Sequence, residues 1–381
     1  MNRLGNITKK ICFIILAYLT LDIIFFSLLP NNIKTKIYNN RAHRIKSFYY
    51  HHDFRPNASF VDQWGFNKVI INTNNLGFKD SKIRDVIFKK KNILFIGDSF
   101  TEGVGLKFED SYVGIISKKL KKKNQDIEVL NAAVQSYSPA IYLSKIYNIL
   151  ERKKMPITDI VIMVSGGDFH DDYFRYTGVD KNFIVMHEDP TNKYLIKLIN
   201  FYKSHTLLYQ FISRVTPIRG IPYLIKTTFF EDKKNLEIIE KNKSNKEILN
   251  MKFLKNKDFQ YFYNDEIFNE WGKNAILKSL NFLERIIEIT SKKNIKLTIL
   301  YAKEPNLILK EPNQEVLNFI LDKFKKLEQN NVKFYYINTY DSLYKDKFEK
   351  YKNLFYINDN HWNKKGNMLV SDEILKKIDF N

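Results

Sequence analysis

Cysteine and the usual cofactor-binding loops are scarce in this chain of 381 residues. Its single cysteine, Cys12, excludes an intramolecular disulfide and a cysteine-based metal site. The adjacent histidines His51 and His52 have no carboxylate at ligand spacing, which argues against a histidine-based metal site. The segment Gly103-Val104-Gly105 is not followed by Gly-Lys-Ser/Thr, so it does not form a phosphate-binding loop. The sequence therefore predicts neither a metal nor a cofactor.

Nucleic-acid-binding motifs are also lacking, although positive charge is abundant. Lysine and arginine number 62 against 42 aspartates and glutamates, which gives a formal net charge of +20. Such a charge suits a polyanion or an anionic membrane surface. The lysines are scattered among Asn, Ile, Phe and Tyr residues, which indicates a compositional bias rather than a binding patch. No nucleic-acid partner is expected, and a basic binder with a contiguous lysine face stays open as an alternative.

One long apolar run lies near the N-terminus. Residues 11–29 contain three polar residues, of which Asp22 alone is charged, and two lysines precede them. This length meets the roughly 17 to 25 residues that span a bilayer. No small-x-small cleavage site follows, so we expect residues 1–30 to form an uncleaved single-pass anchor rather than a signal peptide. The rest of the chain is expected on the periplasmic or extracytoplasmic side, against the count of flanking basic residues. Asp22 either faces a partner helix or is tolerated.

From residue 91 onward, short apolar strands alternate with amphipathic helices. Strands are predicted over 92–96, 127–134, 159–164, 295–301, 332–337 and 354–357, and helices over 109–122, 139–154, 273–293, 314–329 and 368–378. Continuous apolar strands separated by helices indicate a parallel sheet covered on both faces. The predicted fold is therefore a three-layer α/β/α sandwich with a central parallel sheet.

Three further segments are expected to accompany this α/β domain, which is predicted over residues 91–381. Residues 31–90 predict an irregular lead-in that packs on the domain, with 69–72 as its one clear strand. The alternation is lost over 169–272, although 194–215 has a helical pattern. Because this segment leaves the sheet at a strand's carboxyl end, we interpret it as a cap-like insertion over the site. Its mixed-charge part, 231–257, is interpreted as a solvated helix.

The turn after the strand over 92–96 carries the candidate nucleophile. Gly97-Asp98-Ser99 ends that strand abruptly, and the turn lifts Ser99 to the carboxyl edge of the sheet. A serine needs a base that is held by a carboxylate. His361 and Asp359 share a polar loop near the C-terminus, which would bring both beside Ser99. The alternatives are that Ser99 is only a helix N-cap and that His361 is a surface or capping histidine beside Trp362.

The Gly-Asp-Ser turn and the late histidine loop together resemble the SGNH or GDSL serine hydrolases. In that family the first block carries the nucleophile, and a late Asp and His complete a triad, which here implies Ser99, His361 and Asp359. Asp359 lies two residues before the histidine, as in membrane-anchored bacterial members with an Asp-x-His-Trp-Asn loop. Asn358 occupies the more usual position of the acid. The resemblance covers roughly residues 49–377, interrupted by the insertion, and implies a flavodoxin-like fold.

The blocks for the oxyanion hole depart from the family pattern. The resemblance implies a hole made by Ser99, Ser136 and Gly167, in which Ser136 replaces the usual glycine and keeps its backbone N–H. Gly167 replaces the asparagine of Gly-x-Asn-Asp. A side-chain donor worth about 3 kcal/mol of transition-state stabilisation is thereby missing. Asn131 is a candidate substitute, and Asp168 either steadies the loops or contacts the triad. The residues expected to support the site are Asp98, Asn131 and Asp168.

The resulting hypothesis is a membrane-anchored serine esterase or acyl-transfer enzyme that needs no metal or nucleotide. His361 would take the proton of Ser99, and the acyl group would pass to water or to a sugar hydroxyl. Acetyl esters on cell-envelope glycans resemble the substrates of anchored relatives, and a membrane acyltransferase is a candidate partner. The alternative is an inactive SGNH-fold protein of the envelope that binds glycans or assists assembly, which Gly167 motivates.

Overall fold

An eight-stranded sheet organises the part of the chain that the computed structural model describes, residues 2–30, 33–34, 44–64, 67–187, 193–209, 243–338, 345–357 and 359–380. The first five strands in spatial order run parallel, and the last three run antiparallel to their neighbours. In spatial order the strands are β12 (Val332–Ile337), β11 (Lys296–Ala302), β8 (Asp159–Val164), β6 (Lys91–Gly97), β7 (Ile127–Asn131), β5 (Lys79–Asp80), β4 (Asn67–Thr73) and β3 (Ser59–Trp64).

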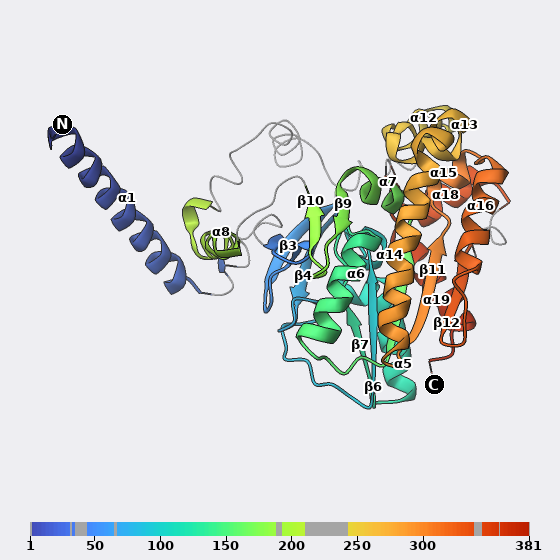
Figure 1. Ribbon diagram of the computed structural model, residues 1–381, viewed down its shortest axis with the longest axis horizontal. Helices are drawn as coiled ribbons and strands as arrows, with labels where there is room; N and C mark the ends of the chain where they lie inside the picture. The colour runs from blue at the N-terminus through green and yellow to red at the C-terminus, as the bar shows by residue number, and fades with distance from the viewer. Residues whose placement is uncertain are drawn as a thin grey trace.

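Helices cover both faces of the sheet, which confirms the predicted three-layer α/β/α architecture (Figure 1). Each layer buries its own apolar cluster against the sheet. One layer holds α6 (Pro139–Tyr147), α14 (Lys273–Ser291) and α16 (Gln314–Lys325), and the other holds α5 (Tyr112–Lys123), α18 (Lys347–Leu354) and α19 (Lys364–Lys377). The sheet is therefore buried on both sides, as its continuous apolar strands predict.

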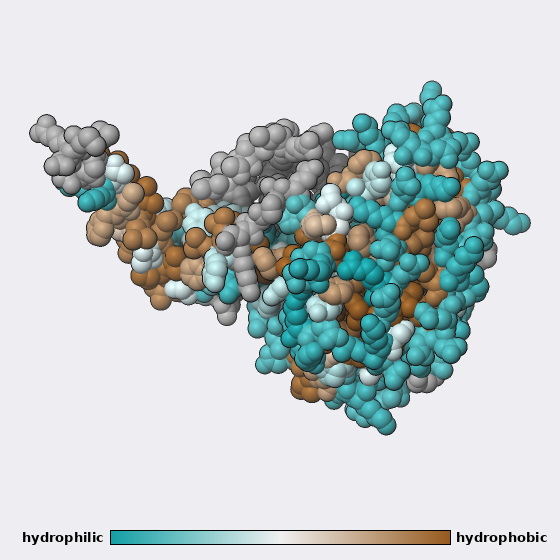
Figure 2. All heavy atoms as spheres, viewed as in Figure 1, coloured by the Kyte–Doolittle hydropathy of each residue, from teal (hydrophilic) through white to brown (hydrophobic). Residues whose placement is uncertain are grey.

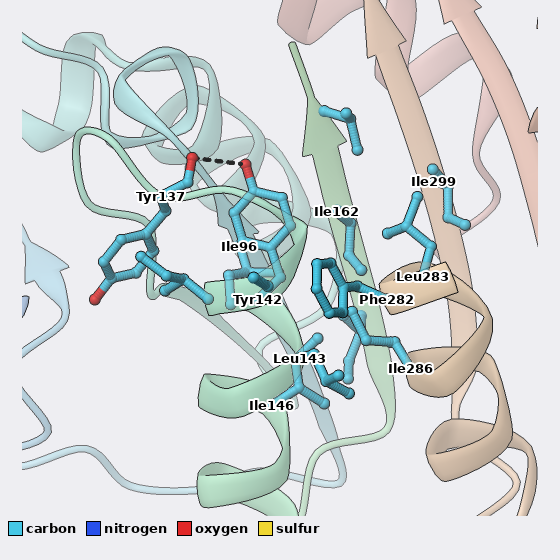
Figure 3. Packing of buried hydrophobic residues seen from close by; sticks show 14 of the residues in the cluster. Ile96, Tyr137, Tyr142, Leu143, Ile146, Ile162, Phe282, Leu283, Ile286 and Ile299 are labelled. Atoms are coloured by element: carbon cyan, nitrogen blue, oxygen red, sulfur yellow. Dashed lines mark hydrogen bonds between the residues drawn. The ribbon is translucent and has the colours of Figure 1, made fainter. Parts of the chain in front are cut away.

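Strand β6 shows how one strand serves two cores. Ile93 and Phe95 belong to one apolar cluster, whereas Leu94 and Ile96 belong to the other. This division follows because successive side chains of a strand point to opposite faces. Figure 3 shows the cluster to which Ile96 belongs. There Leu143 and Ile146 of α6 lie beside Phe282 and Ile286 of α14, against Ile162 of β8.

The segment before β6 is more regular than the irregular lead-in expected from the sequence. It contains β1 (Arg44–Ser47) and β2 (His51–Phe54), which pair with each other, and β3 to β5, which extend the sheet beyond β7. The one strand expected here, over 69–72, lies within β4. The others are short and rich in polar residues, so no run of apolar residues marks them.

A second difference concerns residues 354–357, where the predicted strand is wrong. Leu354 ends α18, which begins after Asp346, whose side chain caps the helix by accepting from the backbone N–H of Phe348 and Glu349. Beyond the helix only an isolated bridge forms, between Phe355 and Trp362. The apolar residues here face the core from the end of a helix rather than from a strand.

The predicted insertion over 169–272 is described in part. Residues 188–192 and 210–242 lie outside the described residues, and with them the part 231–242 of the mixed-charge segment 231–257 and the end of the helical pattern 194–215. The cap-like role therefore stays a prediction. The helices and strands described in or at the start of this region are α7 (Gly166–Phe174), β9 (Tyr176–Val179), β10 (Val185–His187), α8 (Lys193–His205), α12 (Asn245–Leu249) and α13 (Asp265–Ile267). Two further short helices, α4 (Ser99–Glu102) and α15 (Pro305–Leu309), lie outside it.

The N-terminal helix α1 (Asn2–Leu28) projects away from the α/β body (Figure 1). Its segment Ile7–Leu28 is long and apolar enough to cross a membrane, and no other helix among the described residues meets that condition. Only 6% of the residues in this segment are buried. Apolar side chains are thus exposed along most of the helix, as Figure 2 shows.

Candidate active site

The turn between β6 and α4 places Ser99 at the carboxyl edge of the sheet. A Cβ atom at Gly97 would collide with the side chain of Thr101 and approach the carbonyl oxygen of Met163 to 3.0 Å, so the turn requires glycine. Asp98 is the N-cap of α4, because its carboxylate accepts from the N–H of Phe100 at 2.9 Å. Ser99 is therefore not the cap, and its N–H, the first of the helix, has no acceptor within the helix.

Ser99, His361 and Asp359 form a continuous hydrogen-bonded chain. His361 Nε2 lies 2.6 Å from Ser99 Oγ, and His361 Nδ1 lies 2.5 Å from Asp359 Oδ1. The same carboxylate oxygen accepts from the backbone N–H of His361 at 3.0 Å. His361 is only 8% exposed, which disfavours a surface histidine. The predicted residues thus lie together, whereas Asn358 falls outside the described residues.

Residues from distant parts of the chain hold Asp359 in place. The indole Nε1–H of Trp64 donates to Asp359 Oδ2 at 2.7 Å, and the Trp64 ring packs edge-on against the His361 ring at 4.9 Å. The Tyr351 hydroxyl lies 2.9 Å from the carbonyl oxygen and 3.2 Å from the backbone nitrogen of Asp359. Asp359 Oδ1 thus contacts His361 and Oδ2 contacts Trp64, so both carboxylate oxygens are engaged and the side chain is fixed facing the imidazole.

The electrostatics of this chain favour an ionised Asp359 beside a basic imidazole. Burial opposes the charged form of each group, but their mutual attraction outweighs burial. As a result, the pKa of His361 is raised above its usual 6.5 and the pKa of Asp359 is lowered below 3.8. Asp98 adds to the negative potential at His361. The arrangement suits an imidazole that takes a proton from Ser99 and is stabilised once protonated.

Asp98 and Asp168 are linked through Ser165. Ser165 Oγ lies 3.0 Å from Asp98 Oδ2 and 2.9 Å from Asp168 Oδ1, and one hydroxyl proton cannot serve two carboxylates. Burial and the charge of Asp98 raise the pKa of Asp168 well above 3.8. The raised pKa favours a protonated Asp168, and in that form the carboxyl could donate to Ser165 while Ser165 donates to Asp98. In the structure Asp168 contacts the serine and Tyr142 rather than the triad.

The loop after β7 presents Ser136 with φ of 63°, in the left-handed region where glycine is favoured. The backbone of Gln135 is held by two side chains, one on each of its peptide groups. The N–H of Gln135 donates to Glu102 Oε2 at 2.6 Å, and the Gln135 carbonyl lies 2.7 Å from His52 Nε2. In a planar trans peptide the N–H of Ser136 points opposite to that carbonyl. His52 therefore sets the direction of the Ser136 N–H.

The two side chains that hold Gln135, Glu102 and His52, differ in charge. Arg44 donates to both oxygens of Glu102, at 3.0 and 2.8 Å, so the buried carboxylate is paired. Burial and the neighbouring His51 lower the pKa of His52 to about 3. The ring is therefore neutral, and its Nε2 carries the proton because a carbonyl can only accept. His52 Nδ1 then accepts from His51 Nδ1 at 2.8 Å.

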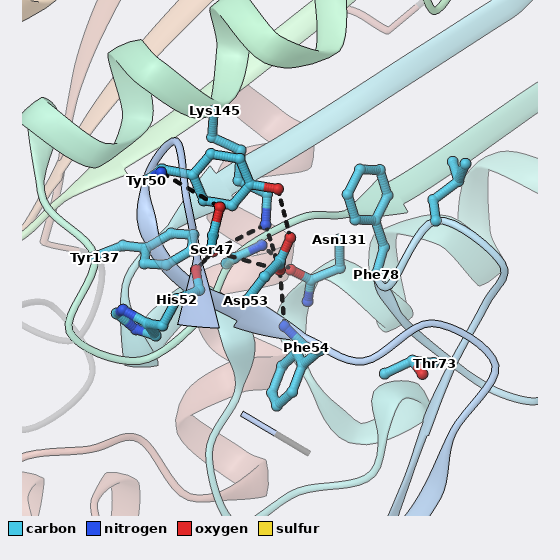
Figure 4. A network of polar contacts seen from close by, with 12 residues as sticks. Ser47, Tyr50, His52, Asp53, Phe54, Thr73, Phe78, Asn131, Tyr137 and Lys145 are labelled. Atoms are coloured by element: carbon cyan, nitrogen blue, oxygen red, sulfur yellow. Dashed lines mark hydrogen bonds and ion pairs between the residues drawn. The ribbon is translucent and has the colours of Figure 1, made fainter. Parts of the chain in front are cut away.

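Behind the same loop lies a buried polar network (Figure 4). Lys145 Nζ donates to Asp53 Oδ1 at 2.8 Å and to the Tyr137 hydroxyl at 3.1 Å. That hydroxyl donates to the carbonyl of His52 at 2.7 Å, so the strand that carries the histidine is anchored as well. Burial lowers the pKa of Lys145, and the attraction of Asp53 opposes this.

The loop after β8 leads into α7 and carries Gly167. The N–H of Gly166 donates to Glu304 Oε1, and the Tyr261 hydroxyl donates to the Gly166 carbonyl at 2.9 Å. The backbone of Gly166 is thus also held on both of its peptide groups. Glu304 Oε2 is buried without a hydrogen-bond partner in the described part of the chain, and burial raises the pKa of Glu304 to about 8.

Asn131, proposed as a substitute oxyanion donor, has its amide engaged elsewhere. Its Nδ2 donates to the carbonyl of Thr101 at 2.9 Å, and its Oδ1 accepts from the N–H of Ala133 at 3.2 Å. The side chain thus joins the end of β7 to α4, which carries Ser99. This contact braces the serine turn from the neighbouring strand.

Sequence reasoning missed several residues that shape the site: Arg44, His52, Trp64, Glu102, Tyr261 and Glu304. Two of them carried a usable signal. Glu102 follows the nucleophile turn by three residues, and Glu304 follows the carboxyl end of a predicted strand, at the edge where the site lies. The others come from the lead-in or the insertion, where no pattern placed them. No cluster of three or more His, Cys, Asp or Glu suited to a metal ion occurs among the residues described.

Comparison with known proteins gives structural neighbours only. Neither a protein-family profile nor a curated protein sequence matches the chain. One solved structure, an acetyl-xylooligosaccharide esterase from Geobacillus, has a TM-score of 0.37 and 12% identity, covering 77% of this chain and 97% of the esterase. An acetyl xylan esterase from the rumen bacterium Butyrivibrio proteoclasticus has a TM-score of 0.33 and 11% identity, covering 82% of this chain and 68% of that one.

Proposed function

We propose that the chain is a serine esterase or acyl-transfer enzyme with Ser99 as nucleophile, His361 as base and Asp359 as the orienting acid. The observation that carries this proposal is the chain of contacts at 2.6 and 2.5 Å that links the three side chains. A nucleophile within hydrogen-bond reach of a base, which is itself held by a carboxylate, is the arrangement that activates a serine. A glycan-binding or assembly module has no need of such a chain.

The proposed reaction begins when Ser99 Oγ attacks an ester carbonyl while His361 Nε2 takes its proton. The negative charge on the carbonyl oxygen is received by backbone N–H groups of Ser99, Ser136 and Gly167. His361 then protonates the departing alcohol, which leaves an acyl-enzyme on Ser99. Water or a sugar hydroxyl, deprotonated by His361, attacks the acyl carbon; the bond to Ser99 Oγ breaks, and His361 returns its proton to that oxygen.

The setting that we propose for this reaction is the outer side of a membrane. In this proposal α1 anchors the chain, and the substrate is a short acyl ester, such as an acetyl group on a cell-envelope glycan. The length and exposure of the segment Ile7–Leu28 support the anchor. A membrane acyltransferase that supplies or consumes the acylated glycan is the proposed partner.

Fluorophosphonate labelling of the full chain in detergent tests the nucleophile, because this reagent reports an activated serine without knowledge of the substrate. We expect labelling that disappears in Ser99→Ala. Ser136→Gly is the matched control, because it removes a hydroxyl but keeps the backbone N–H, and it should stay labelled. A folded wild-type protein that is not labelled would contradict the proposal and favour the binding-module alternative.

The pH dependence of labelling tests the roles of His361 and Asp359. The imidazole must be neutral to take the proton, so labelling should fall as the pH drops through the pKa of His361, which lies above 6.5. Asp359→Asn removes the charge that raises this pKa. The variant should label roughly 10³- to 10⁴-fold more slowly, with its acid limb moved to lower pH. An unmoved acid limb would show that another group controls the rate.

A further inference from the structure

Helix α8 exposes an apolar face beside the N-terminal helix α1. Tyr194 is 78% exposed and Leu198 is 63% exposed, and Leu195 and Phe201 are also exposed on this face. The spacing of these residues places them on one side of the helix. Two aromatic and two leucine side chains on one exposed face are unusual for a helix that is surrounded by water.

The opposite face of α8 is attached to the α/β body. Ile196 is buried there, and Asn200 makes two hydrogen bonds to the backbone of Lys46 in β1, at 3.0 and 2.7 Å. The apolar face is therefore held outward. Figure 1 shows α8 between α1 and the sheet, and Figure 2 shows apolar side chains that continue from α1 toward it.

The end of α8 is tied to α1 within the apolar segment. Asp22 accepts the backbone N–H of Leu207 and of Leu208, at 3.2 Å each, which satisfies the one acidic residue of that segment. Phe26 is buried one turn further along α1, and α1 and α8 are in contact. Leu28 lies six positions after Asp22, so this contact lies about 9 Å along the helix from the end of the apolar segment.

We propose that α8 is an interfacial helix whose apolar face, with Tyr194, Leu198 and Phe201, docks into the lipid surface from which α1 emerges. An amphipathic helix at an interface buries its apolar face about 5–10 Å into the headgroup boundary. That depth agrees with the Asp22 contact. Tyrosine and phenylalanine suit this zone, and the exposed Lys197 at the side of the face suits anionic headgroups.

This docking has a consequence for the site. The strand that α8 holds, β1, also carries Arg44, which pairs with Glu102 beside the Gln135–Ser136 peptide. An interfacial α8 would therefore keep β1, and the loop that its Arg44 supports through Glu102, close to the headgroups. The inference rests on the proposed anchoring by α1, and the experiment is designed so that the two can fail separately.

Lipid quenching in the full-length chain tests the inference. The protein is placed in nanodiscs of phosphatidylcholine and phosphatidylglycerol, with or without brominated phosphatidylcholine, and carries one environment-sensitive thiol label. The native Cys12 reports on α1. In a Cys12→Ser background, Leu198→Cys reports on α8, and Leu277→Cys, on the exposed side of α14, is the matched control. Fluorophosphonate labelling checks that each variant keeps its fold.

We expect the label at Cys12 and the label of Leu198→Cys to be quenched and blue-shifted, and the label of Leu277→Cys to remain unquenched. Quenching at Cys12 but not for Leu198→Cys would overturn the interfacial helix and leave the anchor standing. No quenching at Cys12 would overturn the anchor itself. A shift for Leu198→Cys that depends on protein concentration instead of brominated lipid would mean that a second copy covers α8, which also overturns the proposal.

Discussion

The two loops that flank Ser99 are built on one plan with different electrostatics. They follow β7 and β8, the strands on either side of β6, so both reach the carboxyl edge next to the serine turn. In each loop one residue has its backbone N–H bound to a buried glutamate, and the backbone carbonyl of the same residue accepts from a neutral side chain. In the loop after β7 these partners are Glu102 and His52, and Arg44 balances the charge of the glutamate.

In the loop after β8 the corresponding partners of Gly166 are Glu304 and Tyr261. No basic side chain pairs with Glu304 in the part of the chain described, and burial raises its pKa to about 8. At neutral pH this carboxyl is therefore mostly protonated. Glutamate thus fixes one loop through an ion pair and the other through a neutral hydrogen bond. The same substitution should have opposite effects at the two positions.

Glu102→Gln should have the largest effect, because it leaves Arg44 without its charge partner. Breaking a buried pair by removing one partner costs about 3 kcal/mol or more, so the free energy of unfolding should fall by that amount in denaturant titrations. Fluorophosphonate labelling should slow as well, since the loop that carries the Ser136 N–H loses its anchor. The exposed Glu109→Gln is the matched control and should change neither quantity.

The double variant Arg44→Gln/Glu102→Gln sharpens this result. If the loss in Glu102→Gln comes from an unpaired guanidinium, removing Arg44 as well should restore part of the stability. A double variant that is less stable than the sum of the two single variants would contradict this explanation. The loop after β7 would then depend on packing and not on the ion pair.

Glu304→Gln should stabilise the protein at neutral pH. The folded pKa of Glu304 is about 8, against a usual 4.5, so the unfolded chain releases this proton first as the pH rises. The stability that neutral Glu304 provides is complete below pH about 4.5 and is lost as the pH rises toward 8. Glutamine does not ionise, so the variant should gain roughly 3 kcal/mol at pH 7 and little at pH 4.5. A gain of equal size at both pH values would rule out the proton linkage.

The parallel strands of the sheet, which are buried on both faces, are predicted well from the sequence. Strands over 159–164 and 332–337 appear with the predicted bounds, because a continuous apolar run between helices has few other solutions. Of the short strands β1 to β5, only β4 was anticipated, by the strand predicted over 69–72. The other four are short and rich in polar residues, so no apolar run marks them. The predicted strand at 354–357 failed because an apolar stretch of four residues suits a helix end equally well.

For the candidate site, sequence reasoning found the residues that lie on the ends of strands and in the late loop. The turn at Ser99 and the loop at His361 meet because both lie at the carboxyl edge of a parallel sheet. Trp64 could not be found in the same way, because it is 295 positions away from Asp359 and no local pattern marks it. The raised pKa of Asp168 and the lowered pKa of His52 depend on burial, which the sequence alone does not show.

Gly167→Asn gives the smallest of the expected effects and bears on the loop after β8 alone. A Cβ at this position would meet Phe259 Cζ at 3.5 Å and Ser165 Oγ at 3.8 Å, which are ordinary contacts, and φ is not positive. The backbone therefore accepts a Cβ here, and we expect an asparagine side chain to add a donor near the carbonyl oxygen. We expect labelling to rise roughly tenfold, a part of the 10²- to 10³-fold that one well-placed donor supplies.

Gly167→Asp is the matched control for this gain, because aspartate has nearly the shape of asparagine but offers no N–H and repels a developing negative charge. Labelling should rise in Gly167→Asn and stay level or fall in Gly167→Asp. Equal rates in the two variants would mean that position 167 does not face the reacting carbonyl, and the backbone N–H of Ser99 and Ser136 would then have to serve alone. A gain for asparagine only would show that the loop after β8 keeps the geometry of an oxyanion donor and lacks just the side chain.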